Sequence, residues 1–176
     1  SAASFKQTLS GELPAGWDPE LPVCTPGDKL ATRSASGKVL DALAPRLPAL
    51  IGGSADLTPS NNTRPKGAVD IKPGDFAGRY IRFGIREHGM GAMLNGLALH
   101  GGVIPYGGTF MVFSDYMRGS VRLSALMKAP VVFVIQNNQW AISIPRSIQT
   151  ASETLAQKGV AYGLPCLQID GNDPLA

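Results

Sequence analysis

The sequence predicts a three-layer α/β domain with a mainly parallel sheet. Short apolar runs rich in β-branched residues alternate along the chain with longer segments whose apolar residues recur at helical spacing. The 21 glycines and 14 prolines gather between these segments, as expected of many short connections. Strands that alternate with helices form a parallel sheet covered on both faces, and ligands bind such sheets at the carboxyl ends of the strands.

Composition excludes several classes of function. With 176 residues, of which 44% are hydrophobic and 16% charged, the chain is large enough for one domain with a real core. The lysines and arginines behind its net charge of +3 are scattered, so we expect no nucleic-acid partner. No apolar run has membrane-spanning length, and Cys24 and Cys166 lack metal-site spacing. We therefore expect a soluble, cytoplasmic protein with reduced thiols and no membrane partner.

The first thirty residues differ from the rest of the chain. Residues 1–30 are rich in proline and glycine and show little periodicity, so we expect an extended linker arm. A short helix is expected near Phe5–Leu9, and Trp17 is expected to anchor the arm. Residues 31–176 are expected to form a single α/β domain.

Strands and helices alternate through that domain. Helices are predicted from Thr32 to the prolines at 45 and 48, and over 86–100, 111–127 and 151–162. Strands are predicted over 49–53, 80–83, 103–110, 130–135 and 164–171. The continuous β-branched run 130–135 has the clearest pattern, which is typical of a strand buried on both faces.

Glu87 lies where a strand is expected to turn into a helix. An alternating run, Tyr80–Phe83, stops at Gly84, and a helix-compatible run starts near Arg86. Glu87 has two interpretations: a carboxylate suited to the helix dipole, or a buried acid that presents a proton to a ligand. The second gains support because other polar loops are expected at the same edge of the sheet. These loops span 56–60, 107–113 and 137–140.

The residues alone indicate no more than a ligand-binding α/β domain. No Gly-x-Gly-x-x-Gly follows the first strand, and the sequence has no phosphate-binding P-loop, zinc spacing or Gly-x-Ser-x-Gly elbow.

Three longer stretches, Gly52–Asn61, Arg79–Gly91 and Pro105–Phe110, closely resemble transketolase. They are similar to its middle domain, which binds the aminopyrimidine ring of thiamine diphosphate. The resemblance covers about 1–134 and implies the flavodoxin-like, thiamine-diphosphate-binding fold. Residues 1–30 resemble the segment that links this domain to the preceding diphosphate-binding domain.

The resemblance assigns roles to one acid and three aromatic residues. Glu87 matches the family's catalytic glutamate, which hydrogen-bonds a pyrimidine ring nitrogen and, protonated, favours the imino tautomer that takes the thiazolium proton. Phe110, Phe113 and Tyr116 match the aromatics that enclose the pyrimidine, and Phe113 is the best stacking candidate. Their spacing of three residues also suits an ordinary buried helix face.

Three further residues are assigned to ligand binding by the same resemblance. Arg33 and Ser60 match residues that hold the phosphate of the sugar substrate. Asp56 lies in the cofactor-side loop. Judged by residue type alone, these are a charge at a helix start and two turn residues.

After about residue 130 the chain resembles a second family. Residues 130–176 are similar to the alpha subunit of pyruvate or branched-chain 2-oxoacid dehydrogenase. Asn138 and the Trp140 carbonyl match its magnesium ligands. The family also needs an aspartate about thirty residues earlier, where this chain has Gly107–Thr109. We therefore expect weak binding of magnesium and thiamine diphosphate, and Asn138 also suits an ordinary polar turn.

Because the two families meet near 130–135, we hypothesise that the chain is a laboratory recombinant of two enzyme domains with one fold. We expect a folding scaffold that is inactive alone, because the complementary diphosphate-binding domain is absent. The alternative is transketolase-type ketol transfer, or 2-oxoacid decarboxylation, when such a domain is supplied. A homodimer could present Glu87 from one subunit and Asn138 from the other.

Overall fold

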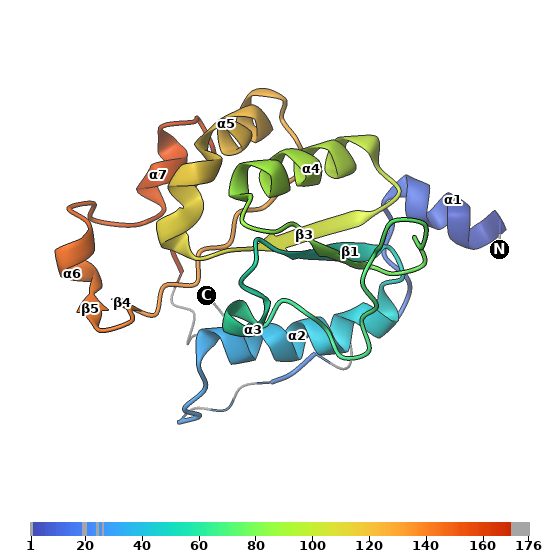
Figure 1. Ribbon diagram of the computed structural model, residues 1–176, viewed down its shortest axis with the longest axis horizontal. Helices are drawn as coiled ribbons and strands as arrows, with labels where there is room; N and C mark the ends of the chain where they lie inside the picture. The colour runs from blue at the N-terminus through green and yellow to red at the C-terminus, as the bar shows by residue number, and fades with distance from the viewer. Residues whose placement is uncertain (1, 19–20, 24, 26, 170–176) are drawn as a thin grey trace.

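A three-stranded parallel sheet lies at the centre of the molecule (Figure 1). The computed structural model describes residues 2–18, 21–23, 25 and 27–169. Strand β1 (Leu50–Ser54) is the middle strand, between β2 (Tyr80–Arg82) and β3 (Ile104–Gly108). Gly52 of β1 is in register with Tyr80 on one side and with Tyr106 on the other. The first three predicted strands and their parallel arrangement are therefore confirmed.

Helices cover both faces of this sheet (Figure 1). Helix α2 (Thr32–Arg46) lies on one face with the short α3 (Thr58–Asn61), and α4 (Glu87–His100) lies on the other. A 3-10 helix, η1 (Met111–Met117), and α5 (Arg118–Leu126) pack against α4. The three-layer α/β fold is confirmed, although the long helix predicted over 111–127 is divided at Met117.

The N-terminal arm includes the helix that the sequence predicts. Helix α1 (Ala2–Ser10) contains the expected segment Phe5–Leu9. Trp17 packs against the buried cluster of Ala44, Leu47 and Leu50. The predicted anchoring role of Trp17 is therefore confirmed.

Two small hydrophobic clusters form the core, one on each face of the sheet. Ala44, Leu47 and Leu50 join α2 to β1, while Ala55, Phe83 and Met90 join the sheet to α4. The central strand carries Gly52 and Gly53 because its neighbours lie very close. A Cβ at these positions would stand 2.0 Å from the Tyr106 carbonyl oxygen and 1.8 Å from that of Ile81.

The strand predicted over 130–135 does not form, and this prediction was wrong. The chain has no helix or strand from Met127 to Asn138. Val132 and Val134 are 85% and 76% exposed. A β-branched pattern is not sufficient for a strand, because the backbone groups also need a neighbouring strand to pair with. In this structure the sheet ends at β3.

The elements from Trp140 to Ile169, the last residues that the structure describes, are short. Strands β4 (Trp140–Ala141) and β5 (Ile144–Pro145) form a small antiparallel pair, followed by α6 (Arg146–Gln149). The helix predicted over 151–162 shrinks to α7 (Gln157–Val160). Nη2 of Arg146 donates to the carbonyl oxygens of Ser152 and Glu153, both at 2.6 Å, and holds that stretch outside a helix.

No strand forms over 164–169 either, and the end of that predicted strand, 170–171, lies outside the described residues. Cys166 is a free, exposed thiol, and Cys24 also lies outside the described residues. None of the helices described here has both the length and the apolar character that crossing a bilayer requires.

Candidate functional site

A sharp turn between β2 and α4 positions Glu87. Gly84 has a φ of +68°, a left-handed conformation that favours glycine. Nη1 of Arg86 donates to the Phe83 carbonyl oxygen at 3.0 Å and closes the turn. Glu87 is then the first residue of α4. The strand, turn and helix predicted around this residue are confirmed.

The Glu87 side chain is buried, with 6% of its surface exposed. Its Oε1 accepts a hydrogen bond of 3.3 Å from the hydroxyl of Thr109, the residue after β3. Among the residues that the structure describes, Thr109 is the one hydrogen-bond partner of this carboxyl group. The helix dipole accounts for a negative charge at this place but not for its burial. The geometry therefore favours the buried-acid interpretation.

A row of three aromatic rings begins directly after Thr109. The Phe110 and Phe113 rings are stacked, with centroids 6.0 Å apart and planes at 26°. Tyr116 continues the row 6.3 Å from Phe113. Phe110 and Tyr116 are 40% and 70% exposed, so this is not an ordinary buried helix face. In η1 the buried residue is Met117. The row offers an accessible aromatic surface near Glu87.

The residues expected at the substrate phosphate lie on two adjacent elements. Arg33 is exposed in the first turn of α2, and Ser60 is half-buried in α3. The two helices approach where Gly37 faces the Asn62 side chain. Asp56 is exposed just beyond β1 and has a φ of 61°. The structure brings none of the three into hydrogen bonding with Glu87, as far as the described residues extend.

Sequence reasoning missed Ser54, the residue that connects the loop after β1 with the end of β3. Ser54 is 1% exposed, and its hydroxyl donates to the Gly108 carbonyl oxygen at 3.0 Å. The Ser54 hydroxyl oxygen in turn accepts hydrogen bonds from the Leu57 amide at 3.2 Å and from Asn61 Nδ2 at 2.9 Å. The only sequence signal was a small polar residue at the end of an apolar strand. Ser54 thereby holds the loop after β1 against the end of β3.

A charged cluster surrounds the buried Tyr80 ring. Nε of Arg82 donates to Asp70 Oδ2 at 2.6 Å, and Arg64 forms an ion pair with the same carboxylate at 3.0 Å. Both guanidinium groups lie over the Tyr80 ring, that of Arg64 at 5.5 Å and that of Arg82 at 5.8 Å from its centroid. The hydrogen bond from Arg82 lowers the pKa of Asp70 and raises that of Arg82. The cluster fastens the loop between α3 and β2 to the sheet.

On the other side of β1, the hydroxyl of Tyr106 donates to the Thr63 carbonyl oxygen at 2.9 Å. Burial raises the pKa of Tyr106, so this side chain remains a hydrogen-bond donor at neutral pH.

The predicted magnesium ligands do not fit a metal site. Oδ1 of Asn138 accepts a hydrogen bond from the Trp140 amide at 3.1 Å, and Oδ1 of Asn137 accepts one from the Gln139 amide at 2.9 Å. Both asparagine oxygens therefore close local turns. The described part of the chain holds no group of three His, Cys, Asp or Glu side chains placed for a metal ion. The polar-turn interpretation of Asn138 fits this geometry better.

The fold, and the buried acid beside an aromatic row at the carboxyl-end edge of the sheet, are those of a ligand-binding α/β domain. A family model described as "Transketolase, pyrimidine binding domain" matches residues 28–138. The chain belongs to this family. A second model, "Dehydrogenase E1 component", matches residues 117–176.

Relatives and solved structures agree with this assignment. A transketolase of Geobacillus stearothermophilus is 51% identical over 176 residues, which cover 99% of this chain and 26% of that protein. A probable transketolase of Schizosaccharomyces pombe is 47% identical, with 98% of this chain and 26% of that protein covered. This chain thus spans about a quarter of the length of these relatives.

Among solved structures, transketolase of Pichia stipitis in complex with sedoheptulose-7-phosphate is similar, with 52% identity and a TM-score of 0.69. The similarity covers 73% of this chain and 20% of that one. Transketolase of Leishmania mexicana has 53% identity and a TM-score of 0.67, over 70% of this chain and 18% of that one. The predicted thiamine-diphosphate-binding fold is confirmed.

Proposed function

We propose that this chain is the aminopyrimidine-binding domain of a thiamine-diphosphate-dependent enzyme of the transketolase type. The observation that carries the proposal is the buried Glu87, at the first turn of α4, beside the row of Phe110, Phe113 and Tyr116. An aminopyrimidine is a flat, aromatic ring with nitrogen acceptors at its edge. A carboxyl group at that edge and a phenyl ring on its face match both properties.

Each residue of the site has a distinct task. Glu87 holds a hydrogen bond to a ring nitrogen, and its burial keeps water from competing for that bond. Thr109 orients the carboxyl group through Oε1. Phe113, the middle ring of the row, stacks on the pyrimidine. When bound, the cofactor supplies the carbanion chemistry, and the protein supplies orientation and one acid.

Arg33 and Ser60 are proposed to bind the phosphate of a sugar substrate, with Asp56 in the adjoining cofactor-side loop. A guanidinium and a hydroxyl suit a phosphate group. The packing of α3 on α2 supports a shared role, because it sets Ser60 on an element next to that of Arg33.

We also propose that the chain is a recombinant of two enzyme domains, joined near 130–135. The two family models overlap only over 117–138, which supports a join there. The sheet ends at β3, before this stretch. Curated transketolases align along nearly the whole chain, whereas the Pichia stipitis structure superposes on 73% of it.

It follows that the 176 residues are non-catalytic by themselves and bind thiamine diphosphate weakly. The metal half-site lacks an acid at Gly107–Thr109, and the Asn138 oxygen is occupied by the Trp140 amide. Ketol transfer would require a complementary diphosphate-binding domain. That assembled enzyme is the alternative function.

A binding titration tests the proposal. The 176-residue chain is titrated with 4-amino-2-methylpyrimidine and, separately, with thiamine diphosphate with and without Mg²⁺. We expect saturable binding of both and little effect of Mg²⁺. We expect a loss of at least about tenfold in affinity for Glu87→Gln, because the neutral amide cannot form the charge-assisted hydrogen bond of a carboxyl group. Glu12→Gln, a change in the exposed arm, is the matched control.

The possible outcomes separate the parts of the proposal. Absence of saturable binding, or equal affinity for Glu87→Gln, would overturn the aminopyrimidine site. Tight binding that requires Mg²⁺ would overturn the argument from the metal half-site. Turnover of a ketose phosphate that Glu87→Gln abolishes would show that the chain is catalytic without a complementary domain.

A further inference from the structure

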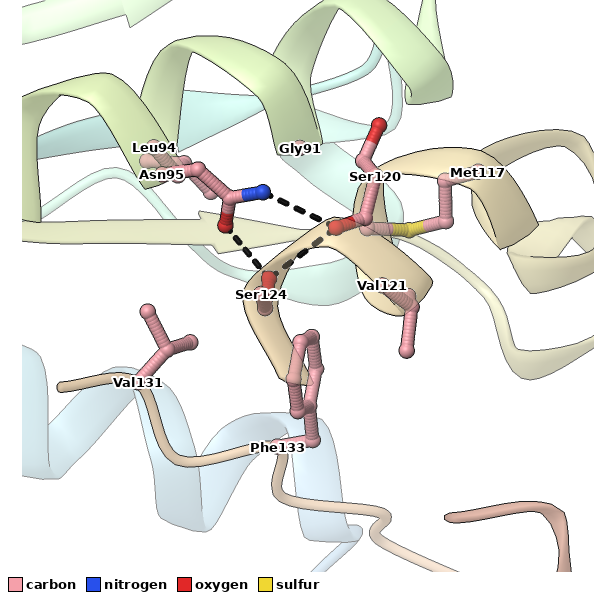
Figure 2. A pocket seen from close by; sticks show the side chains of 9 residues that line it. All are labelled: Gly91, Leu94, Asn95, Met117, Ser120, Val121, Ser124, Val131 and Phe133. Atoms are coloured by element: carbon pink, nitrogen blue, oxygen red, sulfur yellow. Dashed lines mark hydrogen bonds between the residues drawn. The ribbon is translucent and has the colours of Figure 1, made fainter. Parts of the chain in front are cut away.

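A ladder of buried polar groups joins α4 to α5 (Figure 2). Asn95 Nδ2 donates to the Ser120 carbonyl oxygen at 2.9 Å. The hydroxyl of Ser124 donates to Asn95 Oδ1 at 2.5 Å and also lies 3.0 Å from the Ser120 carbonyl oxygen. Asn95, Ser120 and Ser124 are 7%, 1% and 3% exposed. These contacts form the inner rung of the ladder.

The outer rung reaches the residue next to Glu87. Oγ of Ser120 lies 2.8 Å from the His88 carbonyl oxygen and 3.1 Å from His88 Nδ1. Ser120 has one hydroxyl proton, and a carbonyl oxygen can only accept. The hydroxyl therefore donates to the carbonyl, and the ring nitrogen donates to the hydroxyl oxygen. Ser120 thus contacts both the backbone and the side chain of His88.

The packing around Ser120 leaves this side chain little freedom. A Cβ at Gly91 would stand 2.8 Å from the Ser120 Cβ and 2.9 Å from the Met117 Cε. Helices α4 and α5 therefore approach closely at Gly91. A cavity of about 30 Å³ lies beside the ladder, with Val131 and Phe133 on its far side (Figure 2). Separating α4 from α5 would enlarge this cavity, so the close packing of the two helices also holds the ladder in place.

The two residues of the outer rung, His88 and Ser120, lie on elements that carry or adjoin the candidate site. His88 directly follows Glu87 at the start of α4, and η1, which carries Phe113 and Tyr116, runs directly into α5. The Ser120–His88 contact therefore links the start of the acid-bearing helix to α5, the helix that continues directly from the aromatic segment. We propose that Ser120 is a positioning residue, which acts through His88 to set Glu87 against the aromatic row. This inference rests on the proposed aminopyrimidine site.

A double-mutant cycle tests this role. Affinity for 4-amino-2-methylpyrimidine is measured for the full chain, Ser120→Ala, Glu87→Gln and the double variant. If Ser120 acts through Glu87, Ser120→Ala weakens binding by roughly fivefold or more, and this loss disappears in the Glu87→Gln background. A merely structural role would produce the same loss in both backgrounds.

Ser124→Ala is the matched control. It removes a buried serine hydroxyl from the inner rung and leaves the His88 contacts in place. We expect it to lower the unfolding midpoint about as much as Ser120→Ala while changing affinity by less than about twofold, because the two bonds are of one class. If Ser120→Ala does not fold, His88→Ala replaces it. This exposed position should tolerate the change and should show a smaller loss with the same dependence on Glu87.

The outcomes distinguish this inference from the proposed function. If the unchanged chain binds the pyrimidine, Glu87→Gln weakens that binding, and neither Ser120→Ala nor His88→Ala does, the positioning role alone is overturned. Equal losses in the two backgrounds overturn it as well. If the unchanged chain does not bind, the proposed function fails and the inference fails with it.

Discussion

The hydroxyl of Thr109 donates to Oε1 of Glu87 across 3.3 Å, and so connects the end of β3 with the first turn of α4. The distance is long for a bond between two oxygens. The contact can therefore orient the carboxyl group without holding it tightly, and the acid stays available to a ligand.

We expect Thr109→Val, which keeps the shape but removes the donor, to lower the free energy of unfolding by about 1–3 kcal/mol, because the buried Glu87 carboxyl group loses its hydrogen-bond partner. Thr109→Ser, which keeps the hydroxyl, should lose less. Urea denaturation of the three proteins measures this difference. A loss above about 3 kcal/mol would mean that the bond is a main support of α4.

Phe113 is the middle ring of the aromatic row, 6.0 Å from Phe110 and 6.3 Å from Tyr116. Phe113→Leu keeps an apolar side chain but removes the flat ring. We expect affinity for 4-amino-2-methylpyrimidine to fall by about 1 kcal/mol, or roughly fivefold. Phe76→Leu, at a residue that is 77% exposed and outside the row, should leave affinity unchanged. Equal affinity of the two variants would exclude stacking on Phe113.

Arg79 caps the end of α2. Its Nη1 donates to the Leu47 carbonyl oxygen at 2.9 Å and its Nη2 to that of Ala44 at 3.0 Å. A guanidinium suits the negative end of a helix dipole and can serve two carbonyls at once. We expect Arg79→Met to cost about 1–3 kcal/mol of unfolding free energy, and Arg79→Lys to recover only part of it. Full recovery by lysine would mean that charge alone, without the forked geometry, stabilises this end.

Asp70 should make stability depend on pH. The hydrogen bond from Arg82 holds the pKa of Asp70 below its ordinary value. The carboxylate therefore stabilises the fold above the ordinary value near 4, and this contribution is lost as pH falls through the lower pKa of the folded state. We expect Asp70→Asn to be less stable than the unchanged chain at pH 7, with the difference shrinking in strong acid. Thermal unfolding of both proteins between neutral and strongly acidic pH measures it.

Arg82→Met removes the same hydrogen bond from the other side and should flatten the same pH dependence. If the stability difference between Asp70→Asn and the unchanged chain is the same at every pH, the pKa of Asp70 does not differ between the folded and unfolded states.

The run 130–135 is either an exposed irregular segment, as in the structure, or a buried strand, as its sequence pattern predicted. Because Val132 and Val134 are 85% and 76% exposed, we expect the double variant Val132→Ser, Val134→Ser to unfold within about 0.5 kcal/mol of the unchanged chain. A buried strand would lose about 1.5–3 kcal/mol for each valine. Urea denaturation decides between them, and a large loss would restore the predicted strand.

Local pattern was sufficient where an element and its neighbours lie close in sequence. The strand Tyr80–Arg82, the turn at Gly84 and the helix from Glu87 were all predictable, because the alternation, the glycine and the helical spacing each belong to one short segment. The same stretch indicated Glu87 as a candidate acid. The residues alone left open whether Glu87 is buried or is an ordinary carboxylate at the start of a helix.

The C-terminal part was not predictable in this way. The run 130–135 has a strand pattern, but a strand exists only when another strand pairs with its backbone. The first half of the helix predicted over 151–162 does not form, and there the Ser152 and Glu153 carbonyls accept hydrogen bonds from Arg146. Both errors arise because tertiary partners override local propensity.

The sequence by itself determined the order of the first strands and helices and the position of the acid at the start of a helix. The stacking and exposure of the three aromatic rings were decided by the tertiary structure. Only the tertiary structure decided which polar groups support the strands, the helices and the acid. Ser54 bonds to a carbonyl 54 residues away, Thr109 to a carboxyl group 22 residues away and Ser120 to a carbonyl 32 residues away. A hydrogen bond depends on the distance between two groups in space, and folding sets that distance for residues far apart in the chain.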